Sequence, residues 1–159
     1  MNDIDHKVNQ DLLEYQTDRI QHLIKEMVEC CNDRKFYESN KFGLPYAEIN
    51  CLMLFTGERY LTVKVMAEKL DVAKSRVTKL VKGLMDKGLI DQIDDPRDGR
   101  IRLISLSPKG QQLSRQIEAF QKDIHRQLLL HMEPAERKNA LTYLESLRSA
   151  MEAVKEKLV

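Results

Sequence analysis

Two short amphipathic helical segments, joined by a tight corner at 71–73 and followed at once by a turn-rich hairpin signal, occupy residues 61–106. This succession constrains the fold more than any other part of the chain. Thr62 is well placed to be the N-cap of the first helix, and Gly88 to end the second. Apolar side chains recur with helical spacing on one face of each segment, at Val63, Met66, Ala67 and Leu70, then at Val77, Leu80, Val81 and Leu84.

The hairpin signal lies directly after the second helix. Segments Leu89–Ile93 and Arg100–Leu106 are enriched in Ile and Leu, and they flank Asp94–Gly99, a dense turn signal that contains Asp-Gly. This pattern predicts a β-hairpin, which the turn indicates more strongly than the imperfectly alternating strands do. Helix, corner, helix and hairpin in this order are typical of a winged helix-turn-helix.

The rest of the chain is expected to be long helices, because only six Gly and four Pro interrupt its 159 residues. Helical spacing and helix-start signals predict further helices at about 8–37, 45–57, 108–131 and 134–158. The fold class is therefore mainly α, a single domain of residues 1–159 with about six helices and one hairpin. In the last helix a heptad-like apolar seam, which fits either a core or a dimer interface, runs along Leu144, Leu147, Met151, Val154 and Leu158.

Composition excludes several classes of function. The net charge is +1, so a nucleic-acid partner would require positive charge concentrated locally. No apolar run is long enough to span a membrane, and the polar N-terminus has no signal-peptide core, so a cytoplasmic protein is expected. The spacing of the four His and three Cys indicates no metal site, and no catalytic motif or cofactor-binding loop is present, so the chain is not expected to be an enzyme.

The helix at 74–87 concentrates positive charge opposite its apolar face. Its polar side presents Lys74, Ser75, Arg76, Thr78, Lys79 and Lys82. A helix fits the major groove of DNA, where Arg and Lys bond guanine and where Ser and Thr contact bases or phosphates. The alternative is an ordinary solvated basic face on a surface helix.

The hairpin tip adds two arginines, Arg97 and Arg100, on either side of Asp98 and Gly99. An arginine on a narrow protruding ribbon can enter the minor groove and read its width. The alternative is an exposed turn with a surface pair between Asp98 and Arg100, which contributes little to stability. Basic residues on both helix and hairpin favour double-stranded DNA as the partner.

These motifs resemble the multiple-antibiotic-resistance regulator (MarR) family of bacterial transcription factors. The hairpin pattern of the family is found as Asp98-Gly99-Arg100, Ile104, Leu106-Ser107 and Gly110, and the helix pattern as Val77-Thr78-Lys79-Leu80-Val81 with the exit Lys87-Gly88-Leu89-Ile90. Two positions depart from the family pattern: Asp71 replaces a corner glycine, and Ala73 replaces a capping Ser or Thr. In addition, Gly83 lies inside the helix, where it costs about 1 kcal/mol against Ala.

The resemblance implies a homodimer whose interlocking terminal helices place two winged lobes on successive turns of a pseudo-palindromic operator. It also implies that Arg100 enters the minor groove while Asp98 orients it. The expected parts are a winged-helix lobe at 45–106, with the helix-turn-helix at about 62–87 and the wing at about 89–106, and dimerisation helices at 8–37 and 111–158.

Relatives in this family often bind a small aromatic or anionic effector. Side chains that fit such a pocket, or alternatively the core, are Tyr15, Phe42, Tyr46, Met53 and Phe55. The adjacent Cys30 and Cys31 raise the alternative of an oxidant sensor, but small buried hydrophobic side chains are the favoured interpretation of both.

The function expected from these features is that of a homodimeric, sequence-specific DNA-binding repressor released by a small molecule or another signal. The alternative is a winged-helix adaptor that binds protein and not DNA, because a fold alone does not determine a function. Positive charge on both helix and hairpin favours the repressor.

Overall fold

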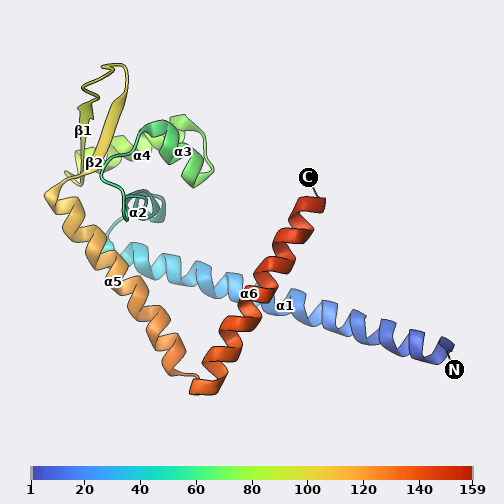
Figure 1. Cartoon of the computed structure of the whole chain (residues 1–159). Helices are drawn as coiled ribbons and strands as arrows, with labels where there is room; N and C mark the ends of the chain where they lie inside the picture. The colour runs from blue at the N-terminus through green and yellow to red at the C-terminus, as the bar shows by residue number, and fades with distance from the viewer. Residues whose placement is uncertain (1, 159) are drawn as a thin grey trace. The chain divides into compact units, whose positions relative to one another are not determined.

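A computed structural model describes residues 2–158 of the chain, with side chains from residue 9 onward. The elements in chain order are α1 (Asn2–Phe42), α2 (Tyr46–Met53), α3 (Val63–Leu70), α4 (Lys74–Asp86), β1 (Ile90–Asp94), β2 (Arg102–Leu106), α5 (Pro108–Leu130) and α6 (Pro134–Lys157) (Figure 1). Two compact units form, one through Gln111 and the other from Gln112 onward. The single domain 1–159 stays a prediction, and Met1 and Val159 lie outside the described residues.

The first unit buries the apolar faces of α2, α3 and α4 against one another. Its fully buried side chains include Ile49, Leu52, Met66, Val77 and Leu84. Helix α1 runs five residues beyond the predicted end at residue 37 and stops at Phe42, where Gly43 takes a positive φ of 64°. Helix α2 ends at Met53, earlier than the predicted stop at Gly57, because i to i−3 hydrogen bonds tighten the chain over the following residues.

Strands β1 and β2 form an antiparallel hairpin that extends from the helices of this unit (Figure 1). Ile90 pairs with Leu106, and Asp94 pairs with Arg102. The connecting loop therefore spans residues 95–101, longer than the predicted Asp94–Gly99 turn. Leu61 adds an isolated bridge to Ile104, with N–H to carbonyl bonds of 2.9 and 2.8 Å in the two directions. The linker between α2 and α3 is therefore attached to the hairpin.

Helix α5 begins where the sequence predicts. Ser107 is its N-cap, and the Ser107 hydroxyl accepts the N–H of Gly110 at 3.0 Å and donates to the carbonyl of Gly88 at 2.7 Å. In the second unit, α6 starts with a capping box between Glu133 and Glu136, and none of its side chains is buried. None of the described helices is both long and apolar enough to cross a bilayer.

Candidate nucleic-acid interface

Helix α4 separates its apolar and polar sides as the sequence predicts. Val77, Val81 and Leu84 are buried, whereas Leu80 is half-buried and so less enclosed than the pattern suggested. The polar side is exposed to solvent along the whole helix, at Lys74, Ser75, Arg76, Thr78, Lys79 and Lys82. The helix core therefore fixes one side of α4 and leaves the cationic side available to a partner.

The two departures from the family pattern, Asp71 and Ala73, lie at the corner that leads into α4. Asp71 takes the left-handed conformation, with φ 52° and ψ 50°, as expected of a residue that replaces a corner glycine. Ala73 is the N-cap of α4, and it makes no side-chain cap bond. The amides of the first turn therefore lack a capping oxygen from this position, and the positive end of the helix favours an anion there.

The loop at the hairpin tip is held by two aspartates that bond to main-chain amides. Asp95 Oδ1 accepts the N–H of Arg97 at 2.8 Å, and Asp98 Oδ1 accepts the N–H of Arg100 at 3.0 Å. The resemblance implies that Asp98 orients Arg100, and the contact found between them runs through the backbone of Arg100. The turn geometry leaves the side chains of Arg97 and Arg100 exposed.

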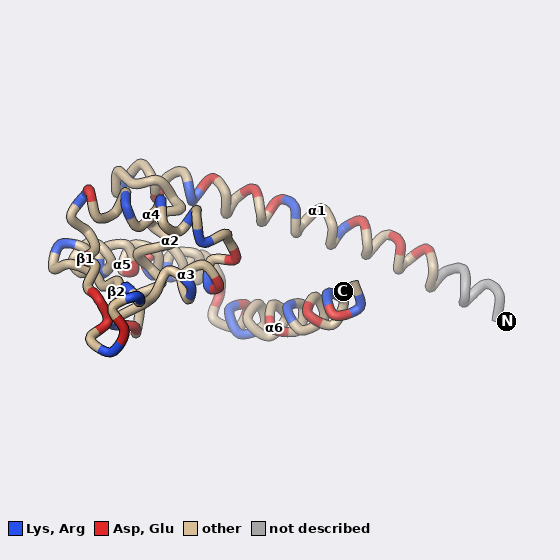
Figure 2. The backbone as a smooth tube through the Cα atoms, turned by 90° about the horizontal axis from the view of Figure 1, so that it is seen from above, with Lys and Arg blue, Asp and Glu red and all other residues tan. Residues whose placement is uncertain are grey.

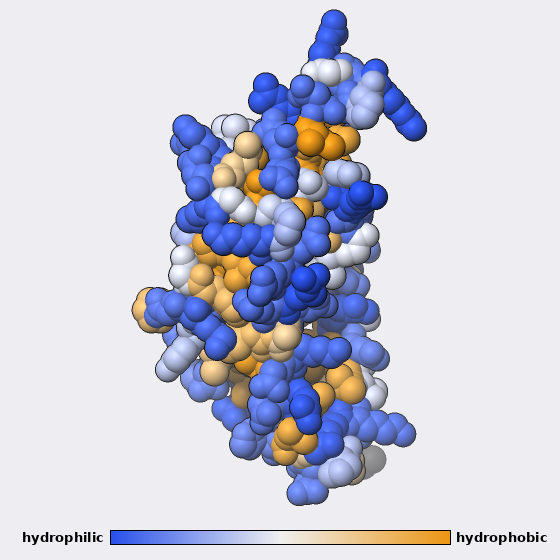
Figure 3. Space-filling view, turned by 90° about the vertical axis from the view of Figure 1, so that its left-hand side faces the viewer, coloured by the Kyte–Doolittle hydropathy of each residue, from blue (hydrophilic) through white to orange (hydrophobic). Residues whose placement is uncertain are grey.

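Charges of both signs crowd this loop, as the backbone view shows (Figure 2). The hairpin tip is covered by hydrophilic side chains and lies at the top of the space-filling view (Figure 3). An exposed ribbon end with fixed backbone and free arginine side chains has the form that minor-groove contact requires.

One set of contacts escaped the sequence reasoning. Glu48, in the first turn of α2, is only 7% exposed, and Lys87 contacts its carboxylate with bonds of 2.7 and 2.5 Å. A Cβ at Gly83 would lie 2.8 Å from Glu48 Oε1. The glycine that sequence analysis interpreted as a cost to α4 therefore leaves room for a buried carboxylate. The available signal was an acidic residue in the mostly apolar α2 and a glycine four residues before a lysine.

The residues predicted to line an effector pocket do not all come together. Tyr15 and Phe42 lie on the same helix, 27 residues and therefore about 40 Å apart. Tyr15 is also two-thirds exposed, so it shares no pocket with Phe42 in one protomer. Phe42, Tyr46 and Met53 are half-buried, and their role as ligand contacts stays a prediction.

Phe55 is buried and lines a hollow of about 340 Å³ in the first unit. The other side chains lining this hollow are mostly polar, namely Glu58, Arg59, Tyr60, Ser105, Leu106 and Gln111.

Near α1, the pKa of the Tyr46 hydroxyl is raised by burial and by the charge of Glu38, while Arg34 opposes this shift.

The three cysteines differ in environment. Cys30 and Cys31 are exposed, so the interpretation of both as buried hydrophobic side chains is wrong within the single chain, where their part of α1 is solvated. Cys51 is fully buried in α2. Burial raises the pKa of the Cys51 thiol to about 12, and the neighbouring charge of Glu48 adds to the effect.

A helix-turn-helix followed by a hairpin that is bridged to the helix linker defines a winged helix-turn-helix protein. Solved structures share this fold. YusO from Bacillus subtilis is 23% identical over 86% of this chain and 97% of its own, with a TM-score of 0.74. FabT from Streptococcus pneumoniae, solved in complex with DNA, is 20% identical over 85% and 99%, with a TM-score of 0.73.

MepR, a transcription regulator of the Staphylococcus aureus multidrug efflux pump MepA, is 17% identical over 82% of this chain and 97% of its own, with a TM-score of 0.74. Identities this low show a common fold. None of the curated proteins matches the sequence. Residues 42–101 match the model of the MarR family. Over these residues, which hold α2 to the hairpin loop, the chain is similar to the MarR family, and its fold is that of the solved MarR-type regulators.

Proposed function

We propose that this chain is a sequence-specific regulator that binds double-stranded DNA as a homodimer and represses transcription until a signal releases it. The observation that carries the proposal is the exposed cationic side of α4, backed by the buried side chains of Val77, Val81 and Leu84. A rigid helix with this arrangement fits the major groove, with Arg76 and Lys79 among the side chains able to reach base edges.

The wing supplies the second contact. Arg97 and Arg100 project from a loop whose main chain is fixed by Asp95 and Asp98. Because the loop backbone is already ordered, an arginine that enters the minor groove loses little further backbone freedom on binding. The similar FabT structure contains DNA, which supports the proposal for this chain.

The homodimer is supported by large apolar side chains that the single chain leaves in solvent. On α1 these include Leu12, Ile20, Leu23 and Met27, and on α6 they include Leu144, Met151 and Val154. Soluble proteins rarely leave so many apolar groups exposed along helices unless they cover a partner. A second copy of the chain, related by a two-fold axis, would cover them and place two α4 helices about 34 Å apart, one turn of DNA.

An effector is the proposed releasing signal, a small aromatic or anionic molecule. It would lower operator affinity by stabilising a spacing of the two lobes that no longer matches successive major grooves.

The test begins with selection of bound duplexes from a random pool, which reveals the preferred sequence and its symmetry. A pseudo-palindromic site with half-sites one turn apart is the expected result. A folded protein that prefers no duplex over a random one at matched salt would contradict the proposal, and would favour the protein-binding adaptor.

The role of the wing is tested by Arg100→Ala, with Lys122→Ala on the exposed side of α5 as a matched loss of one charge. The Arg100 variant is expected to weaken binding to all duplexes and to lower the slope of log affinity against log salt by about one unit. A titration by mobility shift at several salt concentrations measures both. If the two variants had the same affinity and the same salt slope, the wing would not contact DNA.

A further inference from the structure

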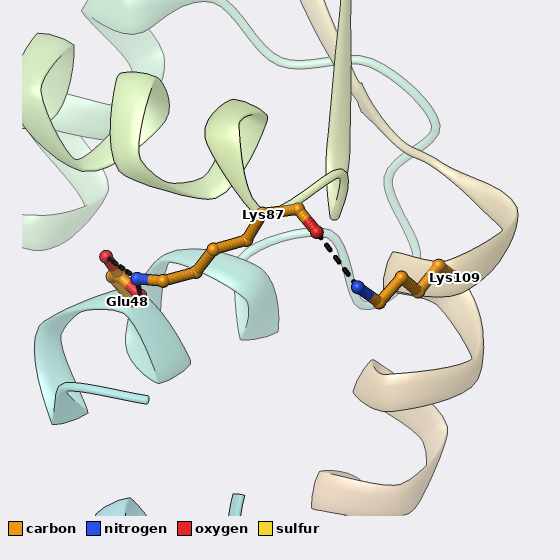
Figure 4. A network of polar contacts seen from close by, with 3 residues as sticks. All are labelled: Glu48, Lys87 and Lys109. Atoms are coloured by element: carbon orange, nitrogen blue, oxygen red, sulfur yellow. Dashed lines mark hydrogen bonds and ion pairs between the residues drawn. The ribbon is translucent and has the colours of Figure 1, made fainter. Parts of the chain in front are cut away.

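The C-terminal end of α4, opposite its basic first turn, is held by an ion pair between a buried carboxylate and an ammonium group whose side chain is 40% exposed. Glu48 lies in the first turn of α2, and its side chain is 9% exposed. Lys87, the C-cap residue of α4, donates from Nζ to both carboxylate oxygens, at 2.7 and 2.5 Å (Figure 4). The two residues are 39 positions apart in sequence, so the pair ties two separate helices together.

Gly83 makes this pair sterically feasible. Gly83 and Lys87 are one helical turn apart and so lie on the same side of α4. A Cβ on residue 83 would come within 2.8 Å of Glu48 Oε1, so the carboxylate rests against the bare helix backbone. The carboxylate of Glu48 is thus enclosed by the backbone of α4 and the ammonium of Lys87.

A second bond fixes the same end of the helix from another direction. Lys109, in the first turn of α5, donates from Nζ to the main-chain carbonyl of Lys87 at 3.0 Å (Figure 4). This carbonyl is among the last of the helix, which lack intrahelical partners. The C-terminal end of α4 is therefore bonded to both α2 and the start of α5, whereas its N-cap, Ala73, makes no side-chain bond.

We propose that Glu48, with Lys87 and Gly83, is a positioning residue that sets the angle at which α4 presents its basic side to DNA. The inference rests on the proposed function. Helix α4 has 13 residues and is about 20 Å long, so a tilt of about 5° at Lys87 moves its first turn by roughly 1.7 Å. A displacement of this size exceeds the range of lengths that hydrogen bonds to base edges tolerate.

Stability alone does not account for such a pair. The Glu48 carboxylate is buried but the Lys87 side chain is 40% exposed, so solvent screens part of their attraction. Replacing a pair that contains a buried charge with apolar groups is often neutral or stabilising, whereas leaving the buried charge alone is destabilising. A pair that fixes a buried carboxylate in one helix orientation gives specificity, because the carboxylate keeps its partner only in that geometry. The contribution of Glu48 is therefore expected in the discrimination between duplexes and not in the general attraction to DNA.

The experiment compares Glu48→Gln, Lys87→Met and the double variant in binding the selected duplex and a random duplex. Each single change is expected to lower the ratio of the two affinities by about tenfold, and the double change by no more than either, because they break one interaction. Affinity for the random duplex and the salt slope stay unchanged. Lys87→Arg, which retains the charge and the donors, is expected to keep most of the ratio.

Two results would overturn the inference. If Lys87 contacts phosphate directly, Lys87→Met weakens binding to both duplexes and lowers the salt slope by about one, while Glu48→Gln has no effect. If the pair is only structural, both variants lose thermal stability but keep the affinity ratio per folded molecule. Gly83→Ala, which displaces the carboxylate without removing a charge, provides a third variant should the others fold poorly.

A measurement without DNA separates this inference from the proposed function. Amide hydrogen exchange of the free protein is expected to accelerate in Glu48→Gln at residues 84–88, with no change at residues 66–70 of α3. Equal acceleration in both helices, or none in α4, contradicts the positioning role. If the wild-type protein prefers no duplex, the proposed function fails while this measurement still decides whether Glu48 holds α4.

Discussion

Replacing Gly110 with alanine should loosen the junction between the wing and α5. An added Cβ would lie 1.8 Å from the carbonyl oxygen of Leu89 and 2.8 Å from its carbon. Both are backbone atoms, so no side-chain rotation relieves the clash and the start of α5 must move away from residues 88–89. The contact itself therefore excludes any side chain at residue 110.

The magnitude follows from the bonds that this junction holds. Ser107 donates its N–H to Leu89 O at 3.1 Å and its hydroxyl to Gly88 O at 2.7 Å, and it accepts the N–H of Gly110 at 3.0 Å. Hydrogen bonds of this kind contribute about 0.5–1.5 kcal/mol each, so loss of all three lowers the free energy of unfolding by about 2–4 kcal/mol. The better helix propensity of alanine offsets up to about 1 kcal/mol of this.

Thermal unfolding followed by circular dichroism measures the effect. For a chain of this length, a net loss of about 1–3 kcal/mol lowers Tm by roughly 3–10 °C. Gly99→Ala is the matched control, because a Cβ there meets nothing within 4 Å and the residue is exposed. If the Tm values of the two variants agree within about one degree, the reasoning is refuted. The close contact of α5 with the Gly88–Leu89 turn would then not be the reason for a glycine at residue 110.

Two further predictions concern the same lobe. Thr62 Oγ1 accepts the N–H of Val65 at 3.3 Å as the N-cap of α3, so Thr62→Ala should lower the free energy of unfolding in urea by about 0.5–2 kcal/mol, and Thr62→Ser should restore most of it. Cys51 should resist a thiol reagent at neutral pH in the native protein and react in urea, while the exposed Cys30 and Cys31 react in both. Because folding raises the pKa of Cys51 from 9.0 to about 12, its contribution to stability is complete below pH 9 and is lost as pH rises toward 12. Cys51→Ala should flatten the fall in stability over this interval, and an unchanged pH profile would contradict the assigned pKa.

Local patterns predicted the parts of the lobe that depend on neighbours in sequence. The cap at Thr62, the left-handed turn at Asp71, the start of α5 at Ser107 and the exposed basic side of α4 all follow from spacing and residue type. These features are governed by contacts within one or two helical turns, which a single sequence displays directly.

Contacts between segments that are distant in sequence could not be predicted from spacing and residue type. Gly83 leaves room for Glu48, which is 35 residues earlier, and the bridge from Leu61 to Ile104 joins the linker between α2 and α3 to the second strand. Neither pair has a pattern of its own in one sequence. The exposure of Cys30 and Cys31 was also missed, because apolar spacing along α1 does not say whether its partner surface lies in the same chain.

The bridge between Leu61 and Ile104 couples the movement of the hairpin to that of α3 when a force or a bound molecule acts on the winged-helix lobe. Since the segment entering α3 and the strand leaving the arginine loop exchange two hydrogen bonds, neither can shift by an ångström without pulling on the other. A rotation imposed on this lobe would therefore move α3, the α4 helix packed against it and the hairpin tip together. Under the proposed function, α4 and the tip would then lose their fit to the duplex in a single cooperative movement.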